Sequence, residues 1–216
     1  MSDDTKTIIL PQEKSRIVLV VDESGSMNPQ RQEVLDNINK LIAQQKAFDP
    51  PNNSNVMFSF VTFNDTINHR VDTSLDTTIP LTQGDYAPSG RTALYEAIGK
   101  TIEKYQNERN VIMVIATDGH ENASAKGYNL TKTGEMVKKC KTDLNWKFLY
   151  VCEDIDQFKE GENMGLQAGA STTTVRAERG TVAGYMGSEC CYKAMDTYRT
   201  ATSIKLPDYG GISHMK

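Results

Sequence analysis

Two aspartates that directly follow long apolar runs are the side chains of this chain best placed to do chemistry. Asp22 follows "RIVLVV" and Asp118 follows "VIMVIAT". Continuous apolar runs are typical of parallel strands buried on both faces, and such sheets bind ligands at the carboxyl ends of their strands. Because neighbouring strands lie about 4.8 Å apart, the pattern predicts two carboxylates close together at one edge of a sheet.

Hydroxyl side chains accompany these two carboxylates. Ser24 and Ser26 follow Asp22 in "DESGSM", and Thr92 opens the stretch "TALYEAI". Two shielded carboxylates repel each other unless a cation compensates them, and donors that are all oxygen suit Mg²⁺, Mn²⁺ or Ca²⁺ better than zinc. We therefore expect a Mg²⁺ site, with Mn²⁺ or Ca²⁺ as alternatives, that a carboxylate of a partner completes. Its predicted ligands are Asp22, Ser24, Ser26, Thr92 and Asp118.

Other interpretations of the same turn stay open. Ser and Asp are good helix caps, so "DESGSM" is also compatible with a capping turn. A serine nucleophile is disfavoured because no G-x-S-x-G elbow surrounds Ser24. A Mg²⁺-dependent phosphoester hydrolase that uses Asp22 is an alternative, although Ser24 stands where a D-x-D enzyme has its second acid. A structural oligomer subunit with a vestigial site is another.

Residues beside the predicted ligands are candidates for contact with a partner. Arg91 directly precedes Thr92, and its guanidinium is expected to pair with an acidic ligand or, without metal, with a site aspartate. The candidate partner-binding residues are Met27, Asn28, Arg91, His120, Glu121 and Asn122.

The elements that must position these residues alternate along the chain. Apolar periodicity and turn signals predict strands at 16–22, 56–63, 66–72, 111–118, 146–152 and 171–175. They predict helices at 30–48, 92–106, 131–142, 156–168 and 178–200. This order favours an α/β fold with a doubly wound, mainly parallel sheet, and the early hairpin adds one antiparallel edge strand.

Length and composition favour one domain. The 216 residues divide into an N-terminal extension (1–14), a domain (15–200) and a C-terminal tail (201–216). The net charge of -4 and the absence of a dense Lys/Arg run give no reason to expect nucleic-acid binding. Lys138, Lys139 and Lys141 are expected on a solvated helix face. No apolar run has the roughly 18 residues of a membrane helix, and we expect a cytoplasmic protein.

The motifs resemble those of the von Willebrand factor A domain. D-x-S-x-S at 22–26, Thr92 in "GRTALYEAI" and Asp118 in "ATDG" match its metal-ion-dependent adhesion site, or MIDAS. Further stretches, among them "TDGHENAS" and "WKFLYVCEDID", are similar to a compact intracellular subgroup found in bacteria and phages. The resemblance implies a Rossmann-like fold and a non-enzymatic, Mg²⁺-dependent protein-binding module.

The resemblance also implies partners that present Asp or Glu, such as AAA+ ATPases or stress and defence assemblies. Two features depart from the family pattern: Arg91 before Thr92, and "CED" after the fifth strand. The oligomeric state is not predicted by any of these features.

Overall fold

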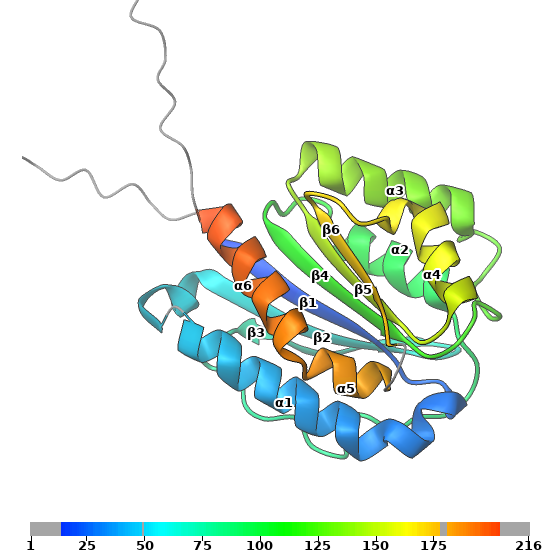
Figure 1. The fold of residues 1–216 in the computed structure, drawn as a ribbon, viewed down its shortest axis with the longest axis horizontal. Coiled ribbons are helices and arrows are strands. Elements are labelled where there is room, and N and C mark those ends of the chain that lie inside the picture. Colours follow the sequence, from blue (N-terminus) through cyan, green and yellow to red (C-terminus); the bar gives the residue numbers. More distant parts are fainter. Residues whose placement is uncertain (1–13, 49, 178–180, 204–216) are drawn as a thin grey trace, which may run out of the picture.

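A computed structural model describes residues 14–48, 50–177 and 181–203. Its sheet has the strand order β3-β2-β1-β4-β5-β6 (Figure 1). The strands are β1 (Ser15–Asp22), β2 (Val56–Phe63), β3 (Ile67–Ser74), β4 (Val111–Thr117), β5 (Lys147–Cys152) and β6 (Thr172–Arg176). All neighbouring pairs are parallel except β2 and β3. The predicted fold class, with one antiparallel edge strand, is confirmed.

Strands β1 and β4 lie side by side at the centre of the sheet. Their register pairs Arg16 with Val111 and Val21 with Ala116. The apolar run of each strand is buried because helices cover both faces of the sheet. Since both strands run in the same direction, Asp22 and Asp118 lie together at the carboxyl ends of β1 and β4, as their positions after the apolar runs predict.

Helices form one layer on each face of the sheet (Figure 1). One layer holds α1 (Arg31–Phe48), α5 (Val182–Met186) and α6 (Glu189–Ser203). The other holds α2 (Leu94–Tyr105), α3 (Leu130–Asp143) and α4 (Ile155–Gly161). Three short helical segments complete the described structure: η1 (Gly25–Gln30), η2 (Pro50–Asn55) and η3 (Glu162–Leu166). Alternate side chains of β1 supply both cores, for example Leu19 to the first and Val20 to the second.

The predicted last helix, 178–200, is wrong as a continuous element. Thr181 caps α5 by accepting the N–H of Gly184 at 2.9 Å. This helix ends just before Gly187, and α6 begins at Glu189. A Cβ at position 187 would lie 2.1 Å from Oδ1 of Asn37, so only glycine allows α1 to approach so closely. Residues 178–180 of the prediction lie outside the described residues.

The predicted domain boundaries fall near the ends of the described residues. The predicted extension and most of the predicted tail lie outside the described residues, so the domain boundaries stay predictions. In the part of the chain that the structure describes, no helix has the length and apolarity needed to cross a bilayer.

Candidate metal centre

Asp22 ends β1 and is fully buried. Its Oδ1 accepts the backbone N–H of Ser24 at 2.7 Å, and its Oδ2 accepts the hydroxyl of Thr117 at 2.6 Å. The hydroxyl of Tyr86 donates to the backbone carbonyl of Asp22 at 2.6 Å. Burial, helped by the nearby charge of Asp118, raises the pKa of Asp22 to about 6 despite these hydrogen bonds. The fold therefore holds this carboxylate in one orientation, in a place that disfavours its charge.

A chain of hydrogen bonds joins the two serines to the second aspartate. The hydroxyl oxygens of Ser24 and Ser26 lie 3.0 Å apart, and the Ser26 hydroxyl donates to Oδ1 of Asp118 at 2.6 Å. The side-chain amide of Gln30 approaches Oδ2 of Asp118 at 3.4 Å. Partial burial raises the pKa of Asp118 above its ordinary value. The turn after β1 and the end of β4 thus meet through their side chains.

Thr92 reaches the same place from the loop before α2. Its backbone N–H donates to Oδ1 of Asn122 at 2.9 Å, which fixes this loop against the one that follows β4. Gly119 shows where the Thr92 hydroxyl lies: a Cβ at 119 would be 2.7 Å from Thr92 Oγ1 and 3.3 Å from Asp22 Oδ2. Oxygen atoms from two distant segments therefore face one space beside Gly119. The structure brings all five predicted ligands together.

The donors around this space fit Mg²⁺. They are two carboxylates and three hydroxyls, all oxygen, and hard divalent cations prefer such ligands. Within the described residues no group of three or more His, Cys, Asp or Glu side chains is placed to hold a metal. Magnesium is usually bound through one or two carboxylates while it keeps several waters, so two carboxylates with hydroxyls suffice. A cation would also relieve the unfavourable burial of Asp22 and Asp118.

The predicted partner-binding residues divide into exposed and structural ones. Asn28 and His120 are exposed, and Nε2 of His120 lies 3.1 Å from a carboxylate oxygen of Asp154. Met27 is instead fully buried, because its side chain belongs to the core between the sheet and α1. Arg91 is exposed and pairs with neither site aspartate: its Nε lies 2.7 Å from Asp65 in the β2–β3 hairpin.

Glu121, which is half-buried, and Asn122, which is exposed, hold the loops of the site in place. The carboxylate of Glu121 accepts the N–H of Tyr95 at the start of α2, and those of Ala123 and Ser124 in its own loop. Asn122 holds Thr92, as described above. Both side chains therefore bind protein groups at the start of α2 and in the loop after β4, and their contact with a partner stays a prediction.

Sequence reasoning missed three residues that shape the site. Glu23 is buried, pairs with Arg70 at 3.1 Å and accepts the N–H of Ala87 at 2.6 Å. Thr117 and Gln30 contact the two aspartates directly. Thr117 was recognisable, because it directly precedes Asp118 on a strand beside β1; the partners of Glu23 and Gln30 come from distant segments that carry no local signal.

Comparisons with known proteins identify the family and the fold of the chain. Residues 17–146 match the sequence profile of the von Willebrand factor type A domain. The same sequence finds no match among curated proteins. Similar solved structures include the PilB minor pilin from Streptococcus sanguinis, with a TM-score of 0.67, 12% identity, and coverage of 91% of this chain and 63% of the pilin.

Two further structures carry the same fold. A von Willebrand factor type A protein from Catenulispora acidiphila has a TM-score of 0.55 and 12% identity over 88% of this chain and 42% of its own. The ArnB paralog VWA2 from Sulfolobus acidocaldarius has a TM-score of 0.52 and 15% identity over 82% and 44%. The chain thus spans less than two thirds of each of these relatives. On the match over 17–146, the chain belongs to the von Willebrand factor type A domain family.

Proposed function

We propose that this protein is a non-enzymatic binding module that holds Mg²⁺ and recruits an acidic side chain of a partner protein. The observation that carries the proposal is the convergence of the five predicted ligands. Hydrogen bonds link Ser24 and Ser26 to Asp118, and oxygens of Thr92 and Asp22 lie beside Gly119. Membership of a family whose domains generally mediate protein–protein interaction supports it.

The residues around this space have distinct tasks. Ser24, Ser26 and Thr92 would offer neutral oxygens, while Asp22 and Asp118 would offer charge directly or through water. Bound Mg²⁺ supplies a positive centre that takes a carboxylate oxygen as a further ligand. The two carboxylates already balance the charge of Mg²⁺, and an incoming Asp or Glu is favoured because its anionic oxygen is a stronger ligand for a hard cation than water or a neutral oxygen. Asn28, Arg91 and His120, exposed near these loops, would contact the rest of the partner.

The proposed class of partner rests on the resemblance of the motifs alone, which names no individual protein. Their similarity to an intracellular bacterial and phage subgroup supports a cytoplasmic protein that binds an AAA+ ATPase or a stress or defence assembly. Mn²⁺ or Ca²⁺ could replace Mg²⁺ at an all-oxygen site. A phosphoester hydrolase is disfavoured because Asp22 is fully buried and both its oxygens accept hydrogen bonds, which leaves it poorly placed to attack a substrate.

Metal binding is tested by calorimetric titration of the protein with Mg²⁺ and Mn²⁺. Ser26→Ala removes one hydroxyl donor and its bond to Asp118, so we expect the affinity for both ions to fall at least about tenfold. Ser89→Ala is the matched control, because Ser89 is an exposed serine in the adjacent loop, outside the predicted ligand set. Equal affinities in all three proteins would contradict the proposed metal site.

Partner binding is tested by affinity capture with the same three proteins, in Mg²⁺ and in EDTA. Proteins captured by the wild type and by Ser89→Ala only in Mg²⁺, and lost with Ser26→Ala, are the expected result. Substituting the acidic residues of a captured partner by amides should then abolish its binding. The same captured proteins in every condition would contradict a metal-dependent module and favour the structural alternative.

A further inference from the structure

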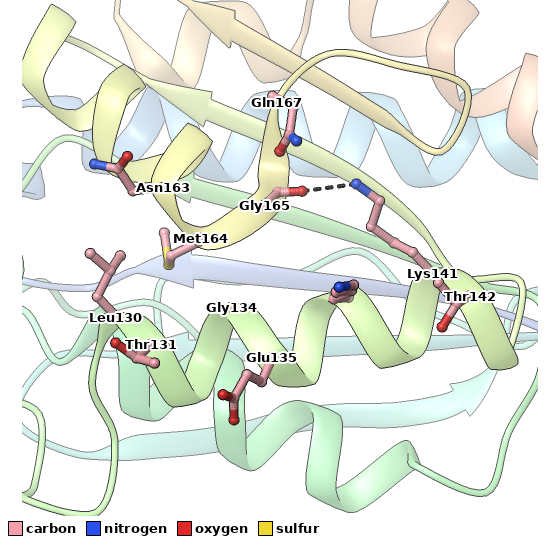
Figure 2. A pocket seen from close by; sticks show the side chains of 11 residues that line it. Leu130, Thr131, Gly134, Glu135, Lys141, Thr142, Asn163, Met164, Gly165 and Gln167 are labelled. Carbon is pink, nitrogen blue, oxygen red and sulfur yellow. Dashed lines mark hydrogen bonds between the residues drawn. The ribbon is translucent and has the colours of Figure 1, made fainter.

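A groove of about 700 Å³ lies between α3 and η3, in the helical layer that contains α2 (Figure 2). None of the residues that line it belongs to the candidate metal centre. Its volume lies within the range of about 300–1,000 Å³ that is typical of ligand sites. The groove is therefore large enough to hold a ligand, and the proposed metal-dependent binding does not use it.

The groove is elongated along α3. Thr131, Glu135, Lys138 and Thr142 line it at helical intervals of three and four residues, which puts them on one face of the helix. At 1.5 Å per residue, the face from Leu130 to Thr142 is about 18 Å long. An extended peptide rises about 3.3 Å per residue, so five residues match this length.

The two ends of the groove differ in chemistry. Leu130 lies at an apolar end, next to the buried Met164, while Lys141 and Thr142 lie at the opposite end (Figure 2). Lys138, which also lines the groove, lies three residues before Lys141 on α3. The Nζ of Lys141 donates to the carbonyl of Gly165 at 2.8 Å, which holds this amine against the far wall. Lys138 is exposed and makes no ion pair with the described residues. This end is thus positively charged in a chain whose net charge is -4.

The wall opposite α3 offers hydrogen-bonding groups. Asn163 and Gln167 line the groove, and their exposed side-chain amides make no hydrogen bond within the described part of the chain. An amide both donates and accepts, so it can bind the N–H and C=O groups of an extended backbone. Glu135 is the single acid among the lining residues, and it stands between the two ends.

We propose that this groove binds an extended acidic peptide segment of a partner protein. Carboxylates of the segment lie at Lys138 and Lys141, and an apolar side chain lies at the half-buried Leu130. Leu130 and Lys138 are separated by about 12 Å along the helix, so the apolar residue stands three or four positions from the acids. Charge-assisted hydrogen bonds to the two lysines supply most of the affinity. The binding requires no metal, so it goes beyond the proposed function.

The test uses a fluorescein-labelled peptide of sequence Glu-Glu-Ser-Ser-Leu, titrated with the full chain in EDTA and followed by fluorescence anisotropy. We expect the wild type to bind it and Lys138→Glu to weaken the binding by about tenfold or more. Lys139→Glu is the matched control: the same charge change at the next residue of α3, outside the groove, should alter the affinity less than about twofold. Glu135→Gln should strengthen binding.

Several results would overturn the proposal. They are an absence of binding to the wild type, equal weakening by Lys138→Glu and Lys139→Glu, or equal binding of a peptide with Gln in place of Glu. Displacement by inorganic phosphate, with no loss of affinity when Leu is replaced by Ser, would indicate a small-anion site instead. In an NMR titration the amide signals of Gly134 and Gly165 should shift, and that of Gly119 should not. Because EDTA is present and Ser26→Ala should bind the peptide normally, this proposal and the metal site fail independently.

Discussion

Among single residues, Asp22 carries the largest electrostatic cost of the candidate metal centre. Its ordinary pKa of 3.8 is raised to about 6 by burial, with Asp118 adding to the effect. As the pH rises from about 4 to 6, the unfolded chain releases this proton before the folded protein does. Folding stability is therefore lost across this window, by about 3 kcal/mol at completion. A cation bound beside Asp22 would restore part of the lost folding stability.

Asp22→Asn should raise the stability of the metal-free protein by about 1–3 kcal/mol at pH 8, because no buried charge remains. The Thr117 hydroxyl, which already lies 3.0 Å from the carbonyl of Gly119, can donate there and accept from the new amide. Urea unfolding in EDTA at pH 8 and pH 4 measures the effect, which should vanish at pH 4. Asp65→Asn, at an exposed carboxylate, is the control and should not gain stability at pH 8.

A stability that depends on pH in the same way for the wild type and Asp22→Asn would contradict this account of Asp22. Addition of Mg²⁺ separates the charge effect from metal binding: it should raise the midpoint of the wild type and leave that of Asp22→Asn unchanged, since a ligand stabilises only the state that binds it.

At the scale of elements, the β2–β3 hairpin holds the turn that follows β1. Arg70 on β3 reaches the buried carboxylate of Glu23, and the backbone N–H of Glu23 donates to the carbonyl of Phe63 at 2.7 Å. The hairpin also reaches the loop before α2, where Asp65 accepts the backbone N–H of Arg91 at 2.9 Å. The hairpin, whose strand β2 pairs with β1, thereby fixes two of the three segments that bring the predicted ligands together.

Two arginines make ion pairs at this hairpin, and we expect their removal to lower the unfolding free energy by different amounts. Arg70→Ala leaves Glu23 buried without its cation, so we expect a loss of about 2–4 kcal/mol of unfolding free energy. Arg91→Ala breaks an exposed pair and should cost less than about 1 kcal/mol. Urea unfolding of the two variants measures both. Similar losses would show that Glu23 does not depend on Arg70.

Replacing either of two glycines along the groove by alanine should change the unfolding free energy, with opposite signs. Gly134 lies inside α3, and a Cβ there would contact Met164 at an ordinary 3.5 Å, so Gly134→Ala should stabilise by about 0.5–1 kcal/mol. Gly165 has a φ of +79°, so Gly165→Ala should cost about 1 kcal/mol through backbone strain alone. Thermal unfolding should therefore move the two midpoints in opposite directions. A lower midpoint for Gly134→Ala would show that α3 and η3 leave no room for the methyl.

For the whole molecule, periodicity and spacing were sufficient to predict the sheet, the hairpin and the convergence of the five predicted ligands. The apolar runs before Asp22 and Asp118 are long enough to require burial on both faces, which favours positions inside the sheet for β1 and β4. Their role as metal ligands stays a prediction. The break at Gly187 was not predictable, because its cause is contact with Asn37 on a distant helix.

The groove was missed for a similar reason. Lys138 and Lys141 have the spacing of an ordinary solvated helix face, and only the approach of η3, turned by Gly165, makes that face one wall of a groove. Sequence patterns record which side of a helix is apolar. They do not show which polar helix face lies opposite another segment of the chain and so lines a groove.

The single tryptophan offers a test of cooperative folding. Trp146 is fully buried in the layer of α2 and α3, and its Nε1 donates to the carbonyl of Glu108 at 2.8 Å. Because the sheet joins both cores, we expect the fluorescence of Trp146 and far-ultraviolet circular dichroism to report one urea transition with one midpoint. Separate midpoints would mean that the two helical layers unfold independently.

The absence of a side chain at Gly119 determines one way in which the candidate metal centre can be lost. A methyl group there would lie 2.7 Å from the hydroxyl oxygen of Thr92 and 3.3 Å from Oδ2 of Asp22, in the space beside these two predicted ligands. Glycine and alanine codons differ by one base, so a single point mutation would fill this space while leaving every predicted ligand in place. A relative with all five residues and alanine at 119 would keep the motif in its sequence and lose the room for an ion.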